Sequence, residues 1–124
     1  MIVKDKVIIV TGSDGLLGKQ IVKEIKSEGG IVIQLDIKNI DDSSNNILHF
    51  DINSDNSINK VINFIKGKYG KIDGLVNNAY PRTSDWNNKL EDVSNDSFSK
   101  NLDMQLSRIF SITKPVLLEM KKVN

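Results

Sequence analysis

A glycine-rich turn near the start of the chain is the first stretch that could do chemistry. Gly12, Gly15 and Gly18 recur every third residue, directly after the apolar run 7–10. Glycines at such points let a chain turn sharply, approach a ligand closely and pack a helix against the preceding strand. The free N–H groups at the start of that helix favour a diphosphate. The sequence therefore predicts a nucleotide site at residues 6–18, while a plain strand-to-helix turn remains the open alternative.

An acidic residue closes the next apolar segment and could select the cofactor. The segment 31–36 ends on Asp36, close to the spacing at which a carboxylate accepts hydrogen bonds from the adenosine ribose of NAD. Its charge would repel the extra phosphate of NADP, and Ile37 follows where an NADP site often supplies arginine. The sequence therefore favours NAD over NADP, with a simple turn-forming aspartate as the alternative.

The elements that must position these residues alternate between strand and helix. Apolar runs predict strands at residues 7–10, 31–36, 47–50 and 71–80. Helical periodicity predicts amphipathic helices that start near residues 17, 55 and 94. Strand, crossover helix and strand within about thirty residues form a βαβ unit with parallel strands. We expect one α/β domain over residues 1–124, with a Rossmann-type parallel sheet in the order 3-2-1-4 that forms an incomplete doubly wound fold.

Polar and aromatic residues follow the fourth predicted strand. Asn77 and Asn78 are costly at the end of a buried strand unless their amides find backbone partners or a ligand. The irregular stretch 81–93 is long enough to be a functional loop. Its Trp86 either lines a substrate site or covers the domain as a hydrophobic lid, and the sequence does not choose between these roles.

Composition argues against several function classes. The chain has no cysteine and a single histidine, His49, so neither a thiolate zinc site nor a multi-histidine site is expected and no metal is predicted. A net charge of +1 gives no reason to expect nucleic acid or an acidic membrane as partner. No apolar run approaches the roughly 20 residues that cross a bilayer, and the first residues lack a signal peptide. We therefore expect a cytoplasmic protein that acts on a small molecule.

In this order, the motifs resemble the N-terminal half of a short-chain dehydrogenase/reductase. The residues that carry the resemblance are Thr11-Gly12-Ser13-Asp14-Gly15-Leu16-Leu17-Gly18, Asp51-Ile52, Asn77-Asn78-Ala79 and Asn101. The resemblance implies that the glycine turn holds the cofactor and that Asp51 and Ile52 contact its adenine ring. It also implies that the asparagine motif borders the nicotinamide ribose and that Asn101 is the catalytic-site asparagine. The predicted cofactor contacts are Thr11, Gly12, Asp14, Gly15, Leu17, Gly18, Asp36, Ile37, Asp51, Ile52, Asn78, Ala79 and Tyr80.

Two departures from the family pattern bear on the substrate. Gly15 gives the spacing Thr-Gly-x-x-Gly-x-x-Gly, which is found more in the extended branch that handles sugar nucleotides. Tyr80 replaces the glycine that commonly ends Asn-Asn-Ala-Gly and places bulk near the nicotinamide. The string Asn-Asn-Ala-Tyr-Pro-Arg is similar to family members associated with bacterial surface-sugar biosynthesis. A sugar derivative is therefore a candidate substrate.

The resemblance also implies a catalytic half that this chain does not contain. Family members are about twice as long, and their catalytic serine and Tyr-x-x-x-Lys pair lie beyond residue 124. We therefore expect the cofactor-binding portion of an NAD(P)-dependent oxidoreductase that acts on a carbonyl or alcohol and is inactive alone. A non-catalytic dinucleotide-binding module is the alternative. A third possibility is a homo-oligomerisation module, because the long helix near residues 98–121 carries an apolar face that would seek a second subunit.

Overall fold

The centre of the structure, a computed structural model that describes residues 2–123, is a four-stranded parallel sheet. Its strands are β1 (Val7–Thr11), β2 (Ile31–Asp36), β3 (Ile47–His49) and β4 (Gly74–Val76). They lie in the order β3-β2-β1-β4, and every neighbouring pair is parallel. The predicted Rossmann-type sheet and its strand order are therefore confirmed.

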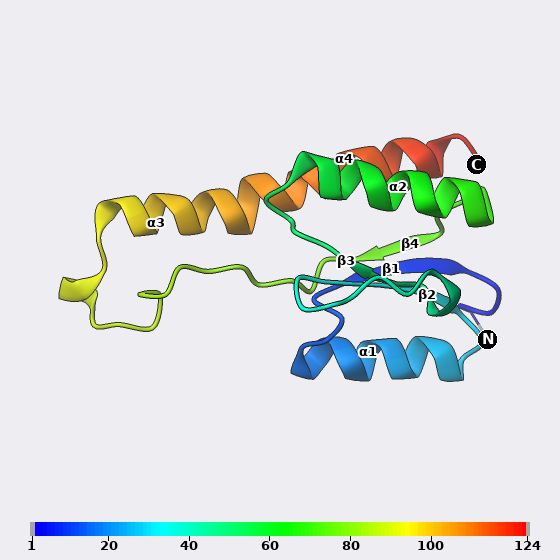
Figure 1. The fold of residues 1–124 in the computed structure, drawn as a ribbon, viewed down its shortest axis with the longest axis horizontal. Coiled ribbons are helices and arrows are strands. Elements are labelled where there is room, and N and C mark those ends of the chain that lie inside the picture. The colour runs from blue at the N-terminus through cyan, green and yellow to red at the C-terminus, as the bar shows by residue number, and fades with distance from the viewer. Residues whose placement is uncertain (1, 124) are drawn as a thin grey trace.

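Helices cover both faces of this sheet. They are α1 (Leu16–Ser27), α2 (Asp55–Tyr69), α3 (Asn95–Leu102) and α4 (Arg108–Lys121), and a π-helical segment, Asp103–Ser107, joins the last two. Figure 1 shows α1 on one face of the sheet and α2 with α4 on the other. Within residues 2–123, no helix has the length and apolar character needed to cross a bilayer.

Alternating side chains of the central strand serve two separate cores. Val7 and Ile9 of β1 pack in the larger core, toward α2 and α4, while Ile8 and Val10 pack in the smaller core, toward α1. The larger core also contains Ile33, Leu35, Leu48, Ile58, Val61, Ile62, Ile65, Ile112 and Val116. A parallel strand buried on both faces needs an unbroken apolar run, which is why residues 7–10 are all aliphatic.

The buried face of α1 differs from the predicted one at a single position. The pattern of Leu17, Ile21 and Ile25, with Val22 beside them, predicts the side of the helix that faces the sheet. Val22 lies in the smaller core and Ile21 and Ile25 pack against it, but Leu17 is 68% exposed. The buried residues of this helix are Gly18 and Val22. Gly18 has no side chain, so it does not contribute to an apolar pattern. The periodicity of apolar residues therefore cannot indicate that helix and strand approach closely at this point.

Asp73 ties the start of β4 to β1. Its carboxylate accepts a hydrogen bond from the Val7 N–H at 2.8 Å and pairs with Lys71 at 3.0 Å and Lys6 at 3.6 Å. Burial raises the pKa of Asp73, but the Val7 N–H and the two lysines together outweigh burial and hold that pKa below its usual value. The carboxylate is therefore ionised at neutral pH and helps to fix the register of the edge strand.

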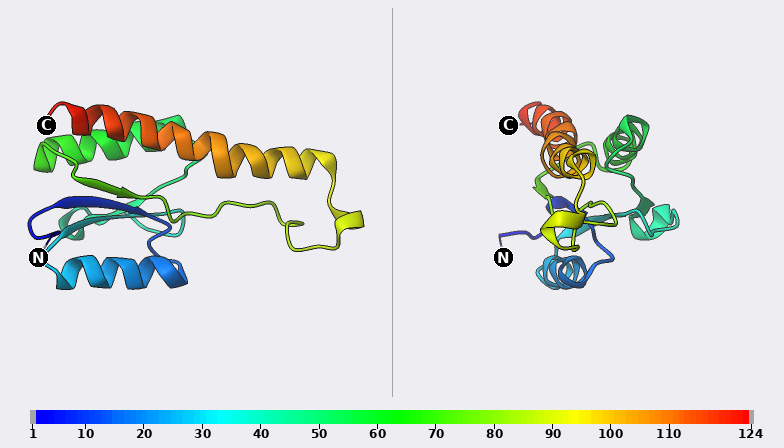
Figure 2. Two further views of the ribbon diagram at one scale, coloured as in Figure 1. Left: turned by 180° about the vertical axis from the view of Figure 1, so that it is seen from behind. Right: turned by 90° about the vertical axis from the view of Figure 1, so that its left-hand side faces the viewer.

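Residues 82–102 form a projecting arm, which extends beyond the sheet (Figures 1 and 2). The arm contains a short 3-10 turn, Leu90–Asp92, at its tip and returns along α3. Two apolar residues of the predicted helical face, Phe98 and Leu102, are more than half exposed there. Only the later part of this helical stretch, with Ile112 and Val116, is buried against the core.

Candidate cofactor site

The glycine turn brings the start of α1 against the end of β1. Gly12 has a φ of +65°, a conformation that favours glycine. Gly18 allows the closest approach, because a Cβ atom there would lie 2.0 Å from the Gly12 carbonyl oxygen. Gly15 stands at the N-cap of α1 without a side-chain cap, and the first turn carries no acidic residue. The leading N–H groups of this helix are thus left without a capping side chain, as an anion site requires.

Thr11 and Asn78 lock the turn to the end of β4. The Thr11 hydroxyl accepts hydrogen bonds from the N–H groups of Asn78 at 3.1 Å and Ala79 at 3.0 Å, and it donates to the Val76 carbonyl at 3.3 Å. The Asn78 side-chain amide donates back to the carbonyls of Thr11 at 3.2 Å and Gly12 at 3.1 Å. The side-chain amide of Asn78 therefore has backbone partners, which is one of the two possibilities, backbone or ligand, that its position at the end of a strand predicted.

A cavity of about 240 Å³ lies at the carboxyl end of the sheet, beside this turn. Seven of the predicted cofactor contacts line it, namely Gly12, Asp36, Ile37, Asp51, Ile52, Ala79 and Tyr80. In open α/β sheets, ligands bind outside the carboxyl ends of the strands where the strand order reverses. Here the order reverses between β1 and β4, so the cavity has the location and the lining expected of a dinucleotide site.

Asp36 is buried at one side of this cavity, with hydrogen-bonding capacity left over. Its two carboxylate oxygens accept hydrogen bonds from the N–H groups of Asp14 and Lys38, each at 3.0 Å. A carboxylate offers about four lone-pair sites, so two backbone donors leave room for two ribose hydroxyls. The contact with the Lys38 N–H, two residues on, is the bond of a turn-forming aspartate. The contact with the Asp14 N–H is long-range and ties the carboxylate to the glycine turn.

The side of the cavity formed by Asp51 and Ile52 is held by a residue that the sequence did not single out. Asp51 accepts a hydrogen bond from the Asn53 N–H at 2.9 Å, which shapes the loop after β3. Arg108, the first residue of α4, donates from Nε to the Ile52 carbonyl at 2.8 Å and pairs with Asp55 at 2.8 Å. Nothing in the local pattern indicated Arg108, because its partners lie more than fifty residues away.

The other predicted cofactor contacts do not line the cavity. Thr11, Gly15, Gly18 and Asn78 belong to the turn and its lock rather than to the cavity wall. Leu17 is exposed in the first turn of α1. Asp14 pairs with Lys19 at 3.1 Å and borders a different cavity, on the α1 face of the sheet.

Asn101, the predicted catalytic asparagine, is buried in α3 and holds the arm. Its Oδ1 accepts a hydrogen bond from the Thr83 N–H at 2.9 Å, and its Nδ2 donates to the Thr83 hydroxyl at 2.7 Å and the Ser97 carbonyl at 2.8 Å. Both amide hydrogens are thereby used inside the protein. The catalytic role of Asn101 stays a prediction, and the geometry itself gives this residue a positioning role.

Gln105 lies one turn further along and reaches the site loop more directly. Its Nε2 donates to the Pro81 carbonyl at 3.2 Å, two residues beyond Ala79. Gln105 belongs to the π-helical segment, an irregularity that is frequent at functional sites. A π-helical turn leaves no recognisable signal in apolar periodicity, so the sequence could not indicate that this side chain faces the loop.

Tyr80 forms the outer rim of the cavity together with residues of the arm. Its hydroxyl accepts a hydrogen bond from the Trp86 indole N–H at 2.9 Å, and the Arg82 guanidinium lies 5.7 Å from its ring centre. Trp86 is half-buried in this cluster. The bulk that replaces the usual glycine is therefore held in place beside the cofactor cavity.

Known proteins share this fold and these motifs. The family model described as short chain dehydrogenase matches residues 6–124. The NAD-dependent glycerol dehydrogenase of Listeria innocua is 31% identical over 126 residues, which cover 95% of this chain and 48% of that protein. The post-translational flagellin modification protein A of Campylobacter coli is 34% identical over 100 residues, which cover 67% of this chain and 37% of that protein.

A solved structure agrees with these similarities. The ligand-free aldohexose dehydrogenase of Thermoplasma acidophilum superposes with a TM-score of 0.80 at 28% identity, covering 95% of this chain and 45% of that one. The chain thus spans less than half the length of each relative named here. Sequence and structure together show that the chain belongs to the short-chain dehydrogenase family of NAD(P)-dependent oxidoreductases.

Proposed function

We propose that residues 2–123 bind NAD as the cofactor-binding portion of an oxidoreductase that transfers hydride between nicotinamide and a carbonyl or alcohol. The observation that carries this proposal is one cavity that joins Asp36, Asp51, Ala79 and the glycine turn at the N-terminus of α1. When bound, the cofactor would supply the hydride chemistry. The chain's own residues would hold the diphosphate at the helix N-terminus, the ribose at Asp36 and the adenine beside Asp51.

Calorimetric titration of the purified chain with NAD and with NADP tests the proposal. We expect NAD to bind about tenfold or more tightly than NADP, a difference of about 1.4 kcal/mol, because the Asp36 carboxylate repels a 2′-phosphate. Asp36→Asn removes the charge and keeps only one of the two oxygens that accept the Asp14 and Lys38 N–H groups. It should therefore narrow the preference for NAD over NADP by weakening NAD binding and by removing the repulsion of the 2′-phosphate. Glu28→Gln, an equal change of charge at the exposed end of α1, should leave the ratio unchanged. Absence of heat with either cofactor would refute the proposal.

We infer that the substrate of the complete enzyme is a polyol or a sugar derivative. Three features support this inference: the glycine spacing, the Asn-Asn-Ala-Tyr-Pro-Arg string, and the names of similar proteins that act on glycerol, an aldohexose or sorbitol 6-phosphate. The Tyr80, Arg82 and Trp86 cluster would then border the substrate, since an aromatic face and a guanidinium suit a hydroxylated ring.

We further propose that these 124 residues do not turn over NADH by themselves. Asn101 and Gln105 are hydrogen-bonded to the arm and the site loop, and neither can serve as the general acid that a carbonyl reduction needs. An absorbance assay with glycerol, dihydroxyacetone and glucose should show no oxidation or reduction of the cofactor above the rate without protein. Turnover above that rate would contradict this proposal.

We also propose association through the long helix. Five apolar residues, each more than half exposed, follow one another at helical spacing along α3, the π-helical segment and α4. They are Phe98, Leu102, Leu106, Phe110 and Leu117. An exposed apolar stripe of this length favours burial against a second subunit. This supports the oligomerisation module as a role that accompanies cofactor binding.

A further inference from the structure

The connection between β2 and β3 leaves part of the sheet uncovered. Parallel strands are usually joined by a crossover of a dozen or more residues, most often a helix. Here residues 37–46 make the connection with only a 3-10 turn, Ser43–Asn45. Consequently α1 stands alone on its face of the sheet, and Figure 2 shows open space beside it, where a second helix would lie in a fully covered parallel sheet.

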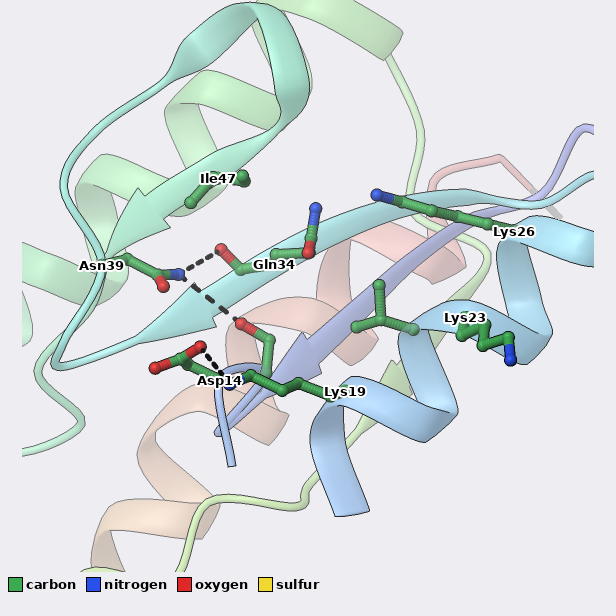
Figure 3. A pocket seen from close by; sticks show the side chains of 9 residues that line it. Asp14, Lys19, Lys23, Lys26, Gln34, Asn39 and Ile47 are labelled. Carbon is green, nitrogen blue, oxygen red and sulfur yellow. Dashed lines mark hydrogen bonds and ion pairs between the residues drawn. The ribbon is translucent and has the colours of Figure 1, made fainter. Parts of the chain in front are cut away.

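A groove of about 430 Å³ occupies this place. As Figure 3 shows, α1 forms one wall, while β2 and β3 contribute Gln34 and Ile47, which pair with each other in the sheet. Val22 of α1 and Ile47 give the groove an apolar lining. The groove lies toward the β3 edge of the sheet, and its lining shares no residue with that of the cofactor cavity, although Ser13 and Asp14 of the glycine turn border it.

Three lysines make the wall of the groove basic. Lys19, Lys23 and Lys26 follow one another along one side of α1. Lys19 pairs with Asp14 at 3.1 Å. Lys23 and Lys26 make no ion pair or side-chain hydrogen bond within residues 2–123. The groove therefore combines an apolar floor with two unpaired positive charges, a combination that suits an acidic amphipathic segment.

The arm of the same chain carries such a segment at its tip. Leu90 is 89% exposed, and Glu91 and Asp92 follow it within the 3-10 turn. Asp96 adds a third carboxylate nearby, while Lys89 is the basic residue next to the turn. Figures 1 and 2 place this tip at the far end of the arm, well away from α1, so a chain cannot insert its tip into its own groove.

We propose that the tip of the arm of one copy docks into the α1 groove of a second copy. Leu90 fills the apolar floor at Val22 and Ile47, and Glu91 and Asp92 pair with Lys23 and Lys26. Two different surfaces meet in this contact, so it is heterologous, and repetition builds a ring or an open filament rather than an isologous pair. The contact is separate from the apolar stripe of the long helix and from the cofactor cavity.

Reciprocal charge reversal tests the proposal by analytical ultracentrifugation. Wild-type chain should form species larger than a dimer, and these should dissociate in 1 M NaCl, where the Debye length is about 3 Å. Glu91→Lys/Asp92→Lys makes both tip and groove basic, and Lys23→Glu/Lys26→Glu makes both acidic. Each double variant alone should therefore lose the large species, with a dissociation constant raised about tenfold or more.

An equimolar mixture of the two double variants supplies the decisive result. Each tip then meets a groove of opposite charge on the other variant, so the large species should return. Lys4→Glu/Lys121→Glu reverses two exposed lysines outside both surfaces and changes the net charge as much as the groove variant does, so it should sediment as wild type. Leu117→Gln tests the helix stripe, and its effect should not be rescued by mixing.

Three outcomes would overturn the proposal. They are a wild-type chain that is monomeric or strictly dimeric at every concentration, double variants that assemble as wild type does, and a mixture that stays dissociated. Binding of a labelled acidic peptide to the groove without self-assembly would assign the groove to another protein. Calorimetry with NAD reports on the cofactor cavity separately, so failure of the docking contact leaves that proposal intact.

Discussion

Gly18→Ala is expected to abolish measurable NAD binding and to destabilise the chain by about 3 kcal/mol or more, the upper range for an overpacked site. The added Cβ would lie 2.0 Å from the Gly12 carbonyl oxygen and 2.9 Å from the Ser13 Cα, both of which are backbone atoms of the turn. No side-chain rotation relieves such an overlap, so the turn must move away from α1. Calorimetry with NAD and urea unfolding measure the two effects.

A matched glycine outside the site provides the control. At Gly67 in α2, a Cβ atom would meet nothing within 4 Å. Gly67→Ala should therefore raise stability by about 0.5 to 1 kcal/mol through helix propensity and leave NAD affinity unchanged. If Gly18→Ala binds NAD as wild type does, the turn does not hold the diphosphate in the way inferred here.

Thr11→Val is expected to cost about 1 to 3 kcal/mol of unfolding free energy, although the two side chains have nearly the same shape. Thr11 is fully buried, and its hydroxyl accepts from two backbone N–H groups, those of Asn78 and Ala79. Valine leaves the Ala79 N–H without this partner, whereas the Asn78 N–H keeps its second acceptor, the Val76 carbonyl, at 3.1 Å. An unsatisfied donor inside the protein costs about 1 to 3 kcal/mol. Urea unfolding monitored by circular dichroism gives the change in stability.

Cofactor binding should respond to the same variant. Without the hydrogen bonds of the Thr11 hydroxyl, Ala79 and Tyr80 are free to shift at the rim of the cavity. NAD affinity should therefore fall about tenfold. Thr11→Ser retains the hydroxyl and loses one methyl group, so it should cost only about 1 kcal/mol and should bind NAD normally. Equal effects of serine and valine would show that the methyl group, and not the hydroxyl, stabilises this position.

Much of the fold could be predicted because its signals are local. Four apolar runs, three amphipathic segments and one glycine turn predict a Rossmann-type parallel sheet in the order 3-2-1-4, and the structure confirms this order. Of the cavity lining, Asp36 was indicated by its position at the end of a strand, whereas Asp51 and Ala79 were expected from the family resemblance. The structure brings all three to the cavity at the carboxyl edge of the sheet.

The prediction was less complete where a contact joins distant segments. Leu17 was assigned to the buried face of α1, whereas the structure buries Gly18, because close approach of two backbones leaves no apolar pattern. Arg108 and Gln105 escaped notice since their partners, Ile52 and Pro81, lie far away in the chain. Side chains selected by long-range packing carry no local signature.

By itself, the sequence determined the strand and helix periods, the glycine turn and the acidic residue after β2, since each depends on neighbours within about twenty residues. Only the tertiary structure decided which polar side chains satisfy one another, as Thr11 and Asn78 do across the sheet. It also decided that a connection too short for a crossover helix leaves a basic groove beside α1. Such features arise from the relative placement of distant elements, which burial and hydrogen-bond satisfaction fix only when the whole chain packs.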